Sequence, residues 1–558
     1  MILSNNSGLV FSFLENGYIK NIDAGRIRIN LKSGNLYDQP GTQLYLRRKS
    51  SAGIEYAPLL GPHNDNKILH TGNTIVVQGV WNGIEYVCQL QLSEKSTSWK
   101  WQINLHNTTS ESVVMDVIWK QEVGLKNLND GLVNEYYVAQ YLERTLLSDK
   151  THGTVIACRQ NTKEATGYPW MMMASAGKAV AGLTDGMQFY GNTYRTTGIP
   201  ESLLQNELPG NMAGESPVVA LQEAPFELAT DTSHSVVFIG TFISNHPEAI
   251  SECDLDILRV VNDEFAEIAV DAADEWIQPK QNLFQTAAFF PSEDLNETEI
   301  ESLFGKEQRL AEKINGQLLS FFSASGSHVV TKAKEEQVDR PHAHIMQAYL
   351  AEVPTEQTLS TTCFATGVFN SHISQGNTNF AVLLSVNTSQ FNANVSSGQR
   401  IFVETDGVQY LLGIPSAFEM GLNFCRWIYK HNDRLLEITT ETYIHAPVIQ
   451  LSFSVLRGNP VRLLVTHDWD KVNSWTLSSS VSGEYVAVPS ANSMLAEKFQ
   501  QAQFRIVVEH ADEVVDSINK AMLYDLHDLF VLETGVVSAF SLSFVGEIKA
   551  KYNFDFNI

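Results

Sequence analysis

The chain has 558 residues, of which 44% are hydrophobic and 18% charged, and its formal net charge at pH 7 is -25. This composition is typical of a globular protein with large cores, and the length allows about three or four domains or two large β domains. A field this negative repels nucleic acid and anionic lipid, so we expect neither as a partner.

The cysteines are few, odd in number and widely scattered: Cys88, Cys158, Cys253, Cys363 and Cys425. No CxxC pair is present, so the pattern favours buried free thiols in a reducing compartment over disulfides or a zinc cluster. The first residues lack a basic start followed by a small-residue cleavage site, and no segment reaches the roughly 20 apolar residues of a membrane helix. We therefore expect a cytoplasmic protein with no membrane contact.

Short apolar and aromatic runs separated by Gly, Asn, Asp and Ser fill residues 1–245, for example TIVVQGVW and WKWQINLHN. The same pattern returns from Thr361 onward, as in VIQLSFSVL and VRLLVTHDW. It is the signature of antiparallel sandwiches. The sequence predicts a mainly β fold with two large antiparallel β-sandwich domains, at 1–245 and 346–558, joined by a helical linker at 246–345.

Three helices are predicted from 3.6-residue periodicity. The central one runs from Ser292, as its N-cap, to Phe322, with apolar residues mostly three, four or seven apart. It would brace the two sandwiches as a rod. The other two predicted helices cover Cys253–Val270, ahead of that rod, and Ala511–Leu529, between late strands of the second sandwich.

Three polar segments have the residue types of a sugar site. The first, NEYYVAQYLE from Asn134 to Glu143, combines tyrosine rings that can stack on a sugar with amides that can bind hydroxyls, although the rings could equally belong to the core. In RPHAH, Arg340, His342 and His344 could contact a substrate or a phosphate, or be structural, and no third metal ligand is close. The third, NSHISQGNTNF, offers Asn370, Gln375 and Asn377.

Two further groups are more easily explained as structural. Glu419, Arg426 and Trp427 could form an internal ion pair with the guanidinium over the indole. In HDWD, Asp468 and Asp470 could supply a general acid, but carboxylate pairs of this kind are common in turns.

In this order, LFQTAAFFPSEDL, RPHAH, GVFNSHISQGNTNF, SGQRIFVETDG and PSAFEMGLNFCRWIYK resemble the N-terminal half of bacterial 1,2-β-oligoglucan phosphorylases. These enzymes belong to the cellobiose-phosphorylase family of inverting glycoside phosphorylases, glycoside hydrolase family ninety-four. The resemblance implies a super-sandwich, a helical linker and an extra sandwich, followed in the family by an (α/α)6 barrel that carries the catalytic Asp.

The resemblance also implies a function. Inorganic phosphate would be the co-substrate, no other cofactor is expected, and a β-glucan oligosaccharide would be the substrate. The barrel segment with the acid has no counterpart here, so no catalytic residue is carried over. Substrate contacts would come from stretches that flank the family's site, through Arg340, His342, Asn370, Gln375 and Asn377. A separate barrel chain or a homodimer is the implied protein partner.

Three hypotheses follow. The chain is the non-barrel half of an oligoglucan phosphorylase, or a stand-alone non-catalytic β-glucan-binding protein, or a hydrolase that uses HDWD. The presence of a barrel partner separates the first from the second, and replacement of Asp468 and Asp470 tests the third.

Overall fold

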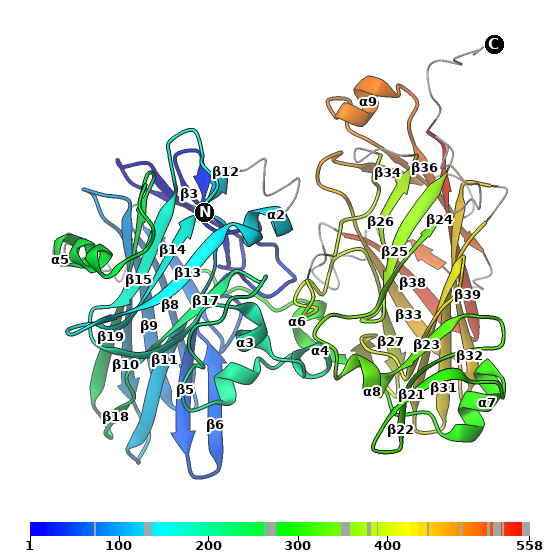
Figure 1. Ribbon diagram of the computed structural model, residues 1–558, viewed down its shortest axis with the longest axis horizontal. Helices are drawn as coiled ribbons and strands as arrows, with labels where there is room; N and C mark the ends of the chain where they lie inside the picture. Colours follow the sequence, from blue (N-terminus) through cyan, green and yellow to red (C-terminus); the bar gives the residue numbers. More distant parts are fainter. Residues whose placement is uncertain are drawn as a thin grey trace. The chain divides into compact units, whose positions relative to one another are not determined.

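The fold was examined in a computed structural model of the chain. It describes residues 1–71, 74–127, 135–261, 265, 275–347, 358–376, 381–387, 389–443, 446–479, 483–509, 514–516, 526 and 529–548. Two compact units are present: Met1–Tyr194 with Ile199–Gln281, and Arg195–Gly198 with Asn282–Ile558. In Figure 1 the first unit runs from blue to green and the second from green to red.

The first unit consists of two mainly antiparallel sheets. The smaller has the order β1 (Ile2–Ser4), β2 (Leu9–Phe13), β3 (Ile19–Ala24), β4 (Ile27–Arg28), β12 (Lys126–Asn127). The larger has the order β6 (Gly53–Pro58), β5 (Thr42–Ser50), β11 (Val113–Glu122), β17 (Val218–Glu223), β16 (Ala179–Leu183), β14 (Gly153–Gln160), β15 (Trp170–Ser175), β19 (Ser233–Ile243), β10 (Ser98–Asn107), β9 (Ile84–Leu92), β8 (Thr74–Trp81), β7 (Lys67–Thr71). Two more strands extend it, with β13 (Leu142–Asp149) on β14 and β18 (Phe226–Leu228) on β11.

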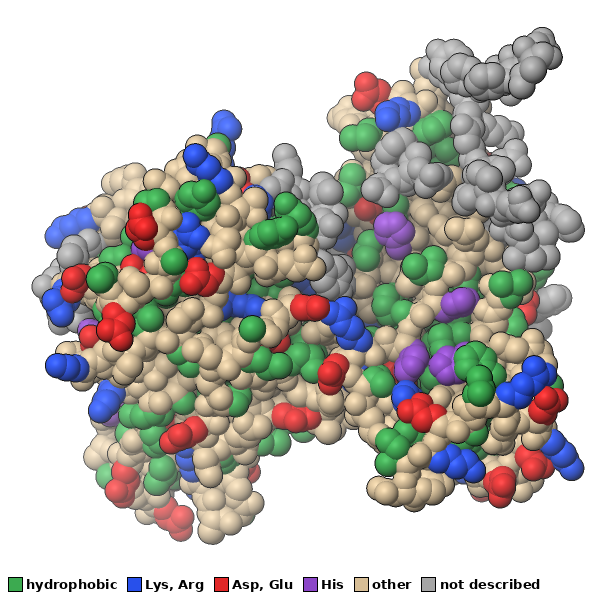
Figure 2. Space-filling model, in the orientation of Figure 1, with side chains coloured by type: hydrophobic (Ala, Val, Ile, Leu, Met, Phe, Trp, Pro, Cys, Tyr) green, Lys and Arg blue, Asp and Glu red, His purple; other side chains and the backbone are tan. Residues whose placement is uncertain are grey.

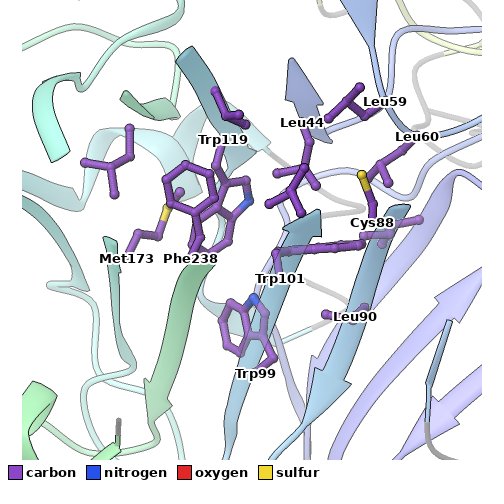
Figure 3. Packing of buried hydrophobic residues seen from close by; sticks show 14 of the residues in the cluster. Leu44, Leu59, Leu60, Cys88, Leu90, Trp99, Trp101, Trp119, Met173 and Phe238 are labelled. Carbon is purple, nitrogen blue, oxygen red and sulfur yellow. The ribbon is translucent and has the colours of Figure 1, made fainter. Parts of the chain in front are cut away.

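One core joins these sheets. Side chains alternate across a strand, so Tyr86, Cys88 and Leu90 of β9 point inward while the residues between them face outward or are partly covered. Large aromatic side chains fill the centre: Trp99 meets Phe11 of the smaller sheet at 5.6 Å and Trp119 at 6.3 Å between ring centroids. Figure 3 shows this tryptophan cluster with Phe238 beside it. Burial of this much aromatic area is the main stabilisation of the unit.

The second unit is also a sandwich. One sheet has the order β24 (Ala343–Gln347), β25 (Leu359–Phe364), β26 (Val368–Gln375), β27 (Gln399–Thr405), β33 (Val461–Asp468), β38 (Leu529–Val537), β37 (Val514–Asp516), with β28 (Val408–Leu411) linking β27 to β20 (Ala288–Phe289). The other has the order β21 (Arg309–Ile314), β22 (Gln317–Phe322), β23 (His328–Thr331), β29 (Ala417–Met420), β30 (Phe424–His431), β31 (Arg434–Thr442), β32 (Val448–Arg457), β39 (Ala539–Gly546), β36 (Phe504–Glu509), β35 (Glu484–Val488), β34 (Thr476–Ser479). Residues of both sheets share one buried core.

The helices in the described residues are short. They are α2 (Glu135–Gln140), α3 (Gly186–Tyr190), α4 (Tyr194–Thr197), η1 (Glu201–Leu204), η2 (Glu252–Leu255), α5 (Asp256–Val261), α6 (Leu283–Thr286), α7 (Glu297–Phe304), α8 (Lys332–Glu335) and α9 (Met494–Lys498). The mainly β fold with two large antiparallel sandwiches is therefore confirmed, whereas the division into three domains stays a prediction.

The prediction of a long central helix from Ser292 to Phe322 is wrong. Only α7 is helical: Asn296, not Ser292, is its N-cap, and it ends at Gly305, whose φ is 86°. The rest of the segment is the hairpin β21–β22, which turns at Asn315 and Gly316 with φ of 51° and 83°. An Asn-Gly pair is the strongest short hairpin signal, because both positions need positive φ. The apolar residues counted as one helical face belong in fact to one short helix and two strands.

The other two predicted helices differ in outcome: the described part of the first is helical, and the described residues 514–516 of the second are a strand. Between Cys253 and Val270 the described helical residues end with α5 at Val261, and most of the remainder lies outside the described residues. In the segment 511–529, Val514–Asp516 form β37 on the sheet edge instead of a helix. Pairing with β38 overrides the local helical pattern there.

The ion pair of Arg426 and Glu419 is present at 3.1 Å, but the guanidinium lies over the ring of Phe304, 4.8 Å from its centroid, and not over Trp427. Neighbouring residues of β30 point to opposite faces, so Arg426 faces α7 while Trp427 enters the core. This contact holds α7 against the outer face of the sheet.

Candidate carbohydrate-contact site in the second unit

The RPHAH segment is positioned by α8 and β24. Glu335, the last residue of α8, is fully buried, and its carboxylate accepts the backbone N–H of His342 at 3.1 Å. The Nδ1 atom of His342 contacts the same carboxylate. The backbone of His342 accepts the N–H of Ala365 at 2.9 Å, just past β25. These bonds fix the orientation of the imidazole.

A histidine and an aromatic ring lie beside this pair. His328 packs edge to face with His342, at 6.0 Å between centroids, and stacks on Phe322 at 4.7 Å. Burial lowers the pKa of His328, and the charges of His342 and Lys334 lower it further. Figure 2 shows histidine and hydrophobic side chains together on this face of the second unit. The site therefore combines a partly buried imidazole with an exposed aromatic ring.

Charged groups complete the site. Lys334 binds Glu312 at 2.7 Å, and its hydrogen bonds lower the pKa of Glu312. Arg195 is buried, and burial lowers its pKa although the carboxylates of Glu335 and Asp339 oppose that effect. Its Nη2 contacts the carbonyl of Val338, while its buried Nη1 has no hydrogen-bond partner. Glu335 is therefore the carboxylate that both Arg195 and His342 face.

This arrangement suits hydroxyl recognition. With Nδ1 held by Glu335, the other imidazole nitrogen of the half-buried His342 can bind a hydroxyl or exchange a proton with it. Within the described part of the chain, no group of three or more His, Cys, Asp or Glu side chains is placed to hold a metal. We call the cluster of Arg195, His328, Glu335, Arg340 and His342 the His342 site.

The predicted substrate-binding residues do not all meet at this site. Arg340 is exposed and lies two residues before His342. Asn370 is in the interior on β26, where its amide donates to Gln399 at 2.7 Å and accepts from Thr361 at 3.1 Å. Gln375 is also buried, and both ends of its amide bind the backbone of Ile548. Asn377 lies outside the described residues.

Three members of the site were not predicted from sequence: Arg195, His328 and Glu335. Glu335 stands in the charged run KAKEEQ, which reads as a solvated surface, and only the tertiary packing reveals its burial. Arg195 is 140 positions earlier in the chain than Glu335, and no local pattern connects them.

The HDWD segment ends β33. His467 is buried between Gln399 and Phe530, and burial lowers its pKa to about 3. Asp468 binds Lys471 at 2.7 Å, and Asp470 accepts the backbone N–H of Asn473 at 2.9 Å. Both carboxylates are thus engaged in a local turn.

Two family domains match this chain in tandem. Residues 12–240 match the SOGP N-terminal domain, and residues 306–546 match the glycoside phosphorylase supersandwich domain. Over 505 residues the chain is 25% identical to a 1,2-beta-oligoglucan phosphorylase of Listeria innocua, a match that covers 89% of this chain. The chain spans 44% of that relative's length.

Solved structures with related folds match weakly. A polysaccharide lyase gives a TM-score of 0.30 at 8% identity over 83% of this chain and 46% of its own. A bacterial glucoamylase in complex with acarbose gives 0.30 at 7% identity over 47% of this chain and 34% of its own. Scores this low carry no argument about this chain.

The domain matches and the two sandwiches define the class: the chain is made of the β-domains of a glycoside phosphorylase. Over most of its length it is similar to the N-terminal, β-sandwich half of a 1,2-beta-oligoglucan phosphorylase. Of the helices in the described ranges, none has the length and apolar character needed to span a bilayer.

Proposed function

We propose that this chain is the carbohydrate-active scaffold of an inverting β-glucan phosphorylase, acting on 1,2-β-oligoglucan in the cytoplasm. The observation that carries the proposal is the tandem match of both β-domains, at 12–240 and 306–546, to the domains of such phosphorylases. The sandwiches would bind glucan and support an (α/α)6 barrel in which the reaction takes place, whether the barrel is in a separate chain or a longer one. A homodimer is compatible with this role.

The proposed reaction needs groups that this half does not supply. Inorganic phosphate attacks the anomeric carbon from the face opposite the glycosidic oxygen, and an acid in the barrel protonates that oxygen. Inversion of a β-linkage yields α-glucose 1-phosphate and a glucan shortened by one unit. We assign no catalytic residue to this chain. HDWD is a poor substitute, because Asp468 and Asp470 are engaged with Lys471 and Asn473.

We further propose that Arg340 and His342 contact the glucan. The support is the oriented imidazole of His342, the exposed Arg340 two residues before it in the sequence, and the ring of Phe322 stacked on His328. Arginine and imidazole donate hydrogen bonds to sugar hydroxyls, and aromatic edges cover the apolar sugar face. Asn370 and Gln375 would act indirectly, by holding β26 in place.

Titration calorimetry with β-1,2-gluco-oligosaccharides tests this role. We expect millimolar or tighter binding to the wild type, and a roughly tenfold loss of affinity, about 1.4 kcal/mol, for Arg340→Ala with His342→Ala. Arg309→Ala, an exposed arginine on β21 of the same unit, is the matched control and should bind normally. Binding without phosphorolysis when a barrel is supplied would instead indicate a non-catalytic glucan-binding protein. Absence of binding would remove the glucan role.

A further inference from the structure

A pair of exposed tyrosines lies at the end of α2 in the first unit, Tyr137 within the helix and Tyr141 just after it. Tyr137 and Tyr141 are 47% and 43% exposed, and their ring centroids are 4.9 Å apart. Gln140, the last residue of α2, is also exposed, and Tyr141 follows it in the turn before β13, so the three exposed side chains lie together at the C-terminal end of the helix. Figure 2 shows hydrophobic side chains gathered at the surface where Figure 1 places α2.

The helix that carries Tyr137 is anchored to the core of the first unit. Val138 and Ala139, on the opposite face, are 1% and 4% exposed. The buried amide of Gln160 donates to the carbonyl of Val138 at 3.2 Å. Immediately after Tyr141 the chain enters β13, where Leu142 pairs with Gln160 of β14. The two rings are therefore presented by an anchored element, and their exposure is part of the fold.

A second amide lies next to the rings. The backbone N–H of the exposed Asn161 donates to the carbonyl of Tyr141 at 2.8 Å, which places Asn161 directly across from it. We define the Tyr137 face as Tyr137, Gln140, Tyr141 and Asn161. The face contains two aromatic rings and two amides, and the side-chain oxygen of Asn161 accepts a hydrogen bond from the guanidinium of Arg159. The adjoining aliphatic residues Val138 and Leu142 are buried.

We propose that the Tyr137 face is a carbohydrate-binding surface for a neutral β-linked gluco-oligosaccharide, separate from the His342 site. Tyrosine rings cover the apolar C–H face of a pyranose, and amides both donate to and accept from its hydroxyls. The ligand class rests on the proposed function; the existence of the surface rests on the geometry.

The surface would hold one part of a long glucan while another part is processed elsewhere. A second contact on the same polymer raises the effective concentration of its reacting end. Its effect should therefore grow with chain length, and short oligosaccharides should gain little from it.

The test compares the wild type with Tyr137→Ala/Tyr141→Ala and Tyr137→Phe/Tyr141→Phe, using titration calorimetry with long β-1,2-glucan. The alanine pair should lose affinity about tenfold, and the phenylalanine pair should stay within about threefold because the rings remain. Tyr443→Ala, a tyrosine of similar exposure (41%) in the second unit, is the control and should match the wild type. Thermal unfolding checks that each variant is folded.

Several results would overturn the proposal. One is equal affinity of the alanine pair and the wild type. Another is an altered sedimentation profile of the alanine pair with glucan binding unchanged, which would make the face a protein contact. Phosphorolysis of short oligosaccharides with a supplied barrel is measured in parallel. If it fails while the tyrosines still govern glucan binding, the proposed function falls and this surface stands; the reverse result removes only the surface.

Discussion

The carboxylate of Glu299 forms ion pairs that hold α7 against the outer face of the second sandwich. It binds Lys430 at 2.9 Å and Arg457 at 2.8 Å, and it also accepts the N–H of Asn296 in the capping box. Burial alone would raise its pKa, but the hydrogen bonds from Arg457, Lys430 and Asn296 outweigh burial and lower the pKa to about 2. Glu299→Gln removes the charge and keeps the side-chain size and a capping acceptor.

The expected loss of stability follows from the exposure of the partners. Arg457 is 45% exposed, so its pair is worth under about 1 kcal/mol. Lys430 is 15% exposed and Glu299 12%, so their charge-assisted bond should contribute about 1 kcal/mol or slightly more. Since glutamine can still cap the helix, the total for Glu299→Gln is about 1–2 kcal/mol.

Hydrogen exchange of the α7 amides is the assay. A loss of stability of this size makes local opening of α7 more frequent, and amide exchange through this opening becomes about 5- to 30-fold faster. Glu297→Gln is the matched control: it lies in the same first turn but is exposed, and it should change exchange by less than about threefold. Equal effects of the two substitutions would refute the assignment of Glu299 as the anchor.

The pH dependence gives a second check. Because the folded pKa of Glu299 is depressed, its contribution is fully present above the unfolded pKa of about 4.5 and is lost as the pH falls toward 2. In urea unfolding, the difference between wild type and Glu299→Gln should therefore shrink below pH 4.5 and vanish near pH 2. A difference that stays constant down to pH 2 would contradict the pairing.

Three further predictions concern the second unit. Gly316→Ala should weaken the β21–β22 hairpin by about 1 kcal/mol, since φ is 83° there, and exchange of residues 309–322 measures it. Asn370→Ala should lower the urea stability of the second unit by about 1–3 kcal/mol by leaving Gln399 unpaired, and unchanged stability would free Asn370 for a direct ligand role. Burial lowers the pKa of His467 to about 3 in the folded state, so the unfolded state binds a proton that the folded state does not, and stability should fall as the pH drops below 6.5. The substitution His467→Gln should flatten this dependence of stability on pH. An unchanged slope would contradict the burial of His467 as a neutral ring.

The strands were predictable because each sandwich buries one face of every strand. Period-two runs such as EYVCQLQL carry that signal locally, and the burial of β9 alternates from Ile84 to Leu90. The long helix was predicted wrongly because the spacing of apolar residues across 303–322 was counted without regard to the turn residues within that segment. Gly305 and the Asn315-Gly316 turn were both visible in the sequence and should have divided the segment.

The candidate site was predictable only in part. Arg340 and His342 stand out because they are only two positions apart in the sequence and unusual in type. Their partner Glu335 is buried by packing of α8, and Arg195 arrives from a distant segment. We expected the polar stretch at Asn370 to contact a sugar, but the structure shows a strand on which the Asn370 amide binds Gln399 of the neighbouring strand inside the core. A run of polar residues in the sequence does not reveal whether its side chains form their hydrogen bonds with solvent or ligand, or with one another inside the core.

The most direct test of the account is phosphorolysis measured with and without a catalytic barrel. The chain is incubated with β-1,2-gluco-oligosaccharide and inorganic phosphate, first alone and then with an (α/α)6 barrel chain of the same family, and α-glucose 1-phosphate is quantified. The account predicts no product from the chain alone and product only when the barrel is added. Release of glucose 1-phosphate by the chain alone, or an active barrel whose rate and glucan affinity are unchanged by this chain, would contradict it.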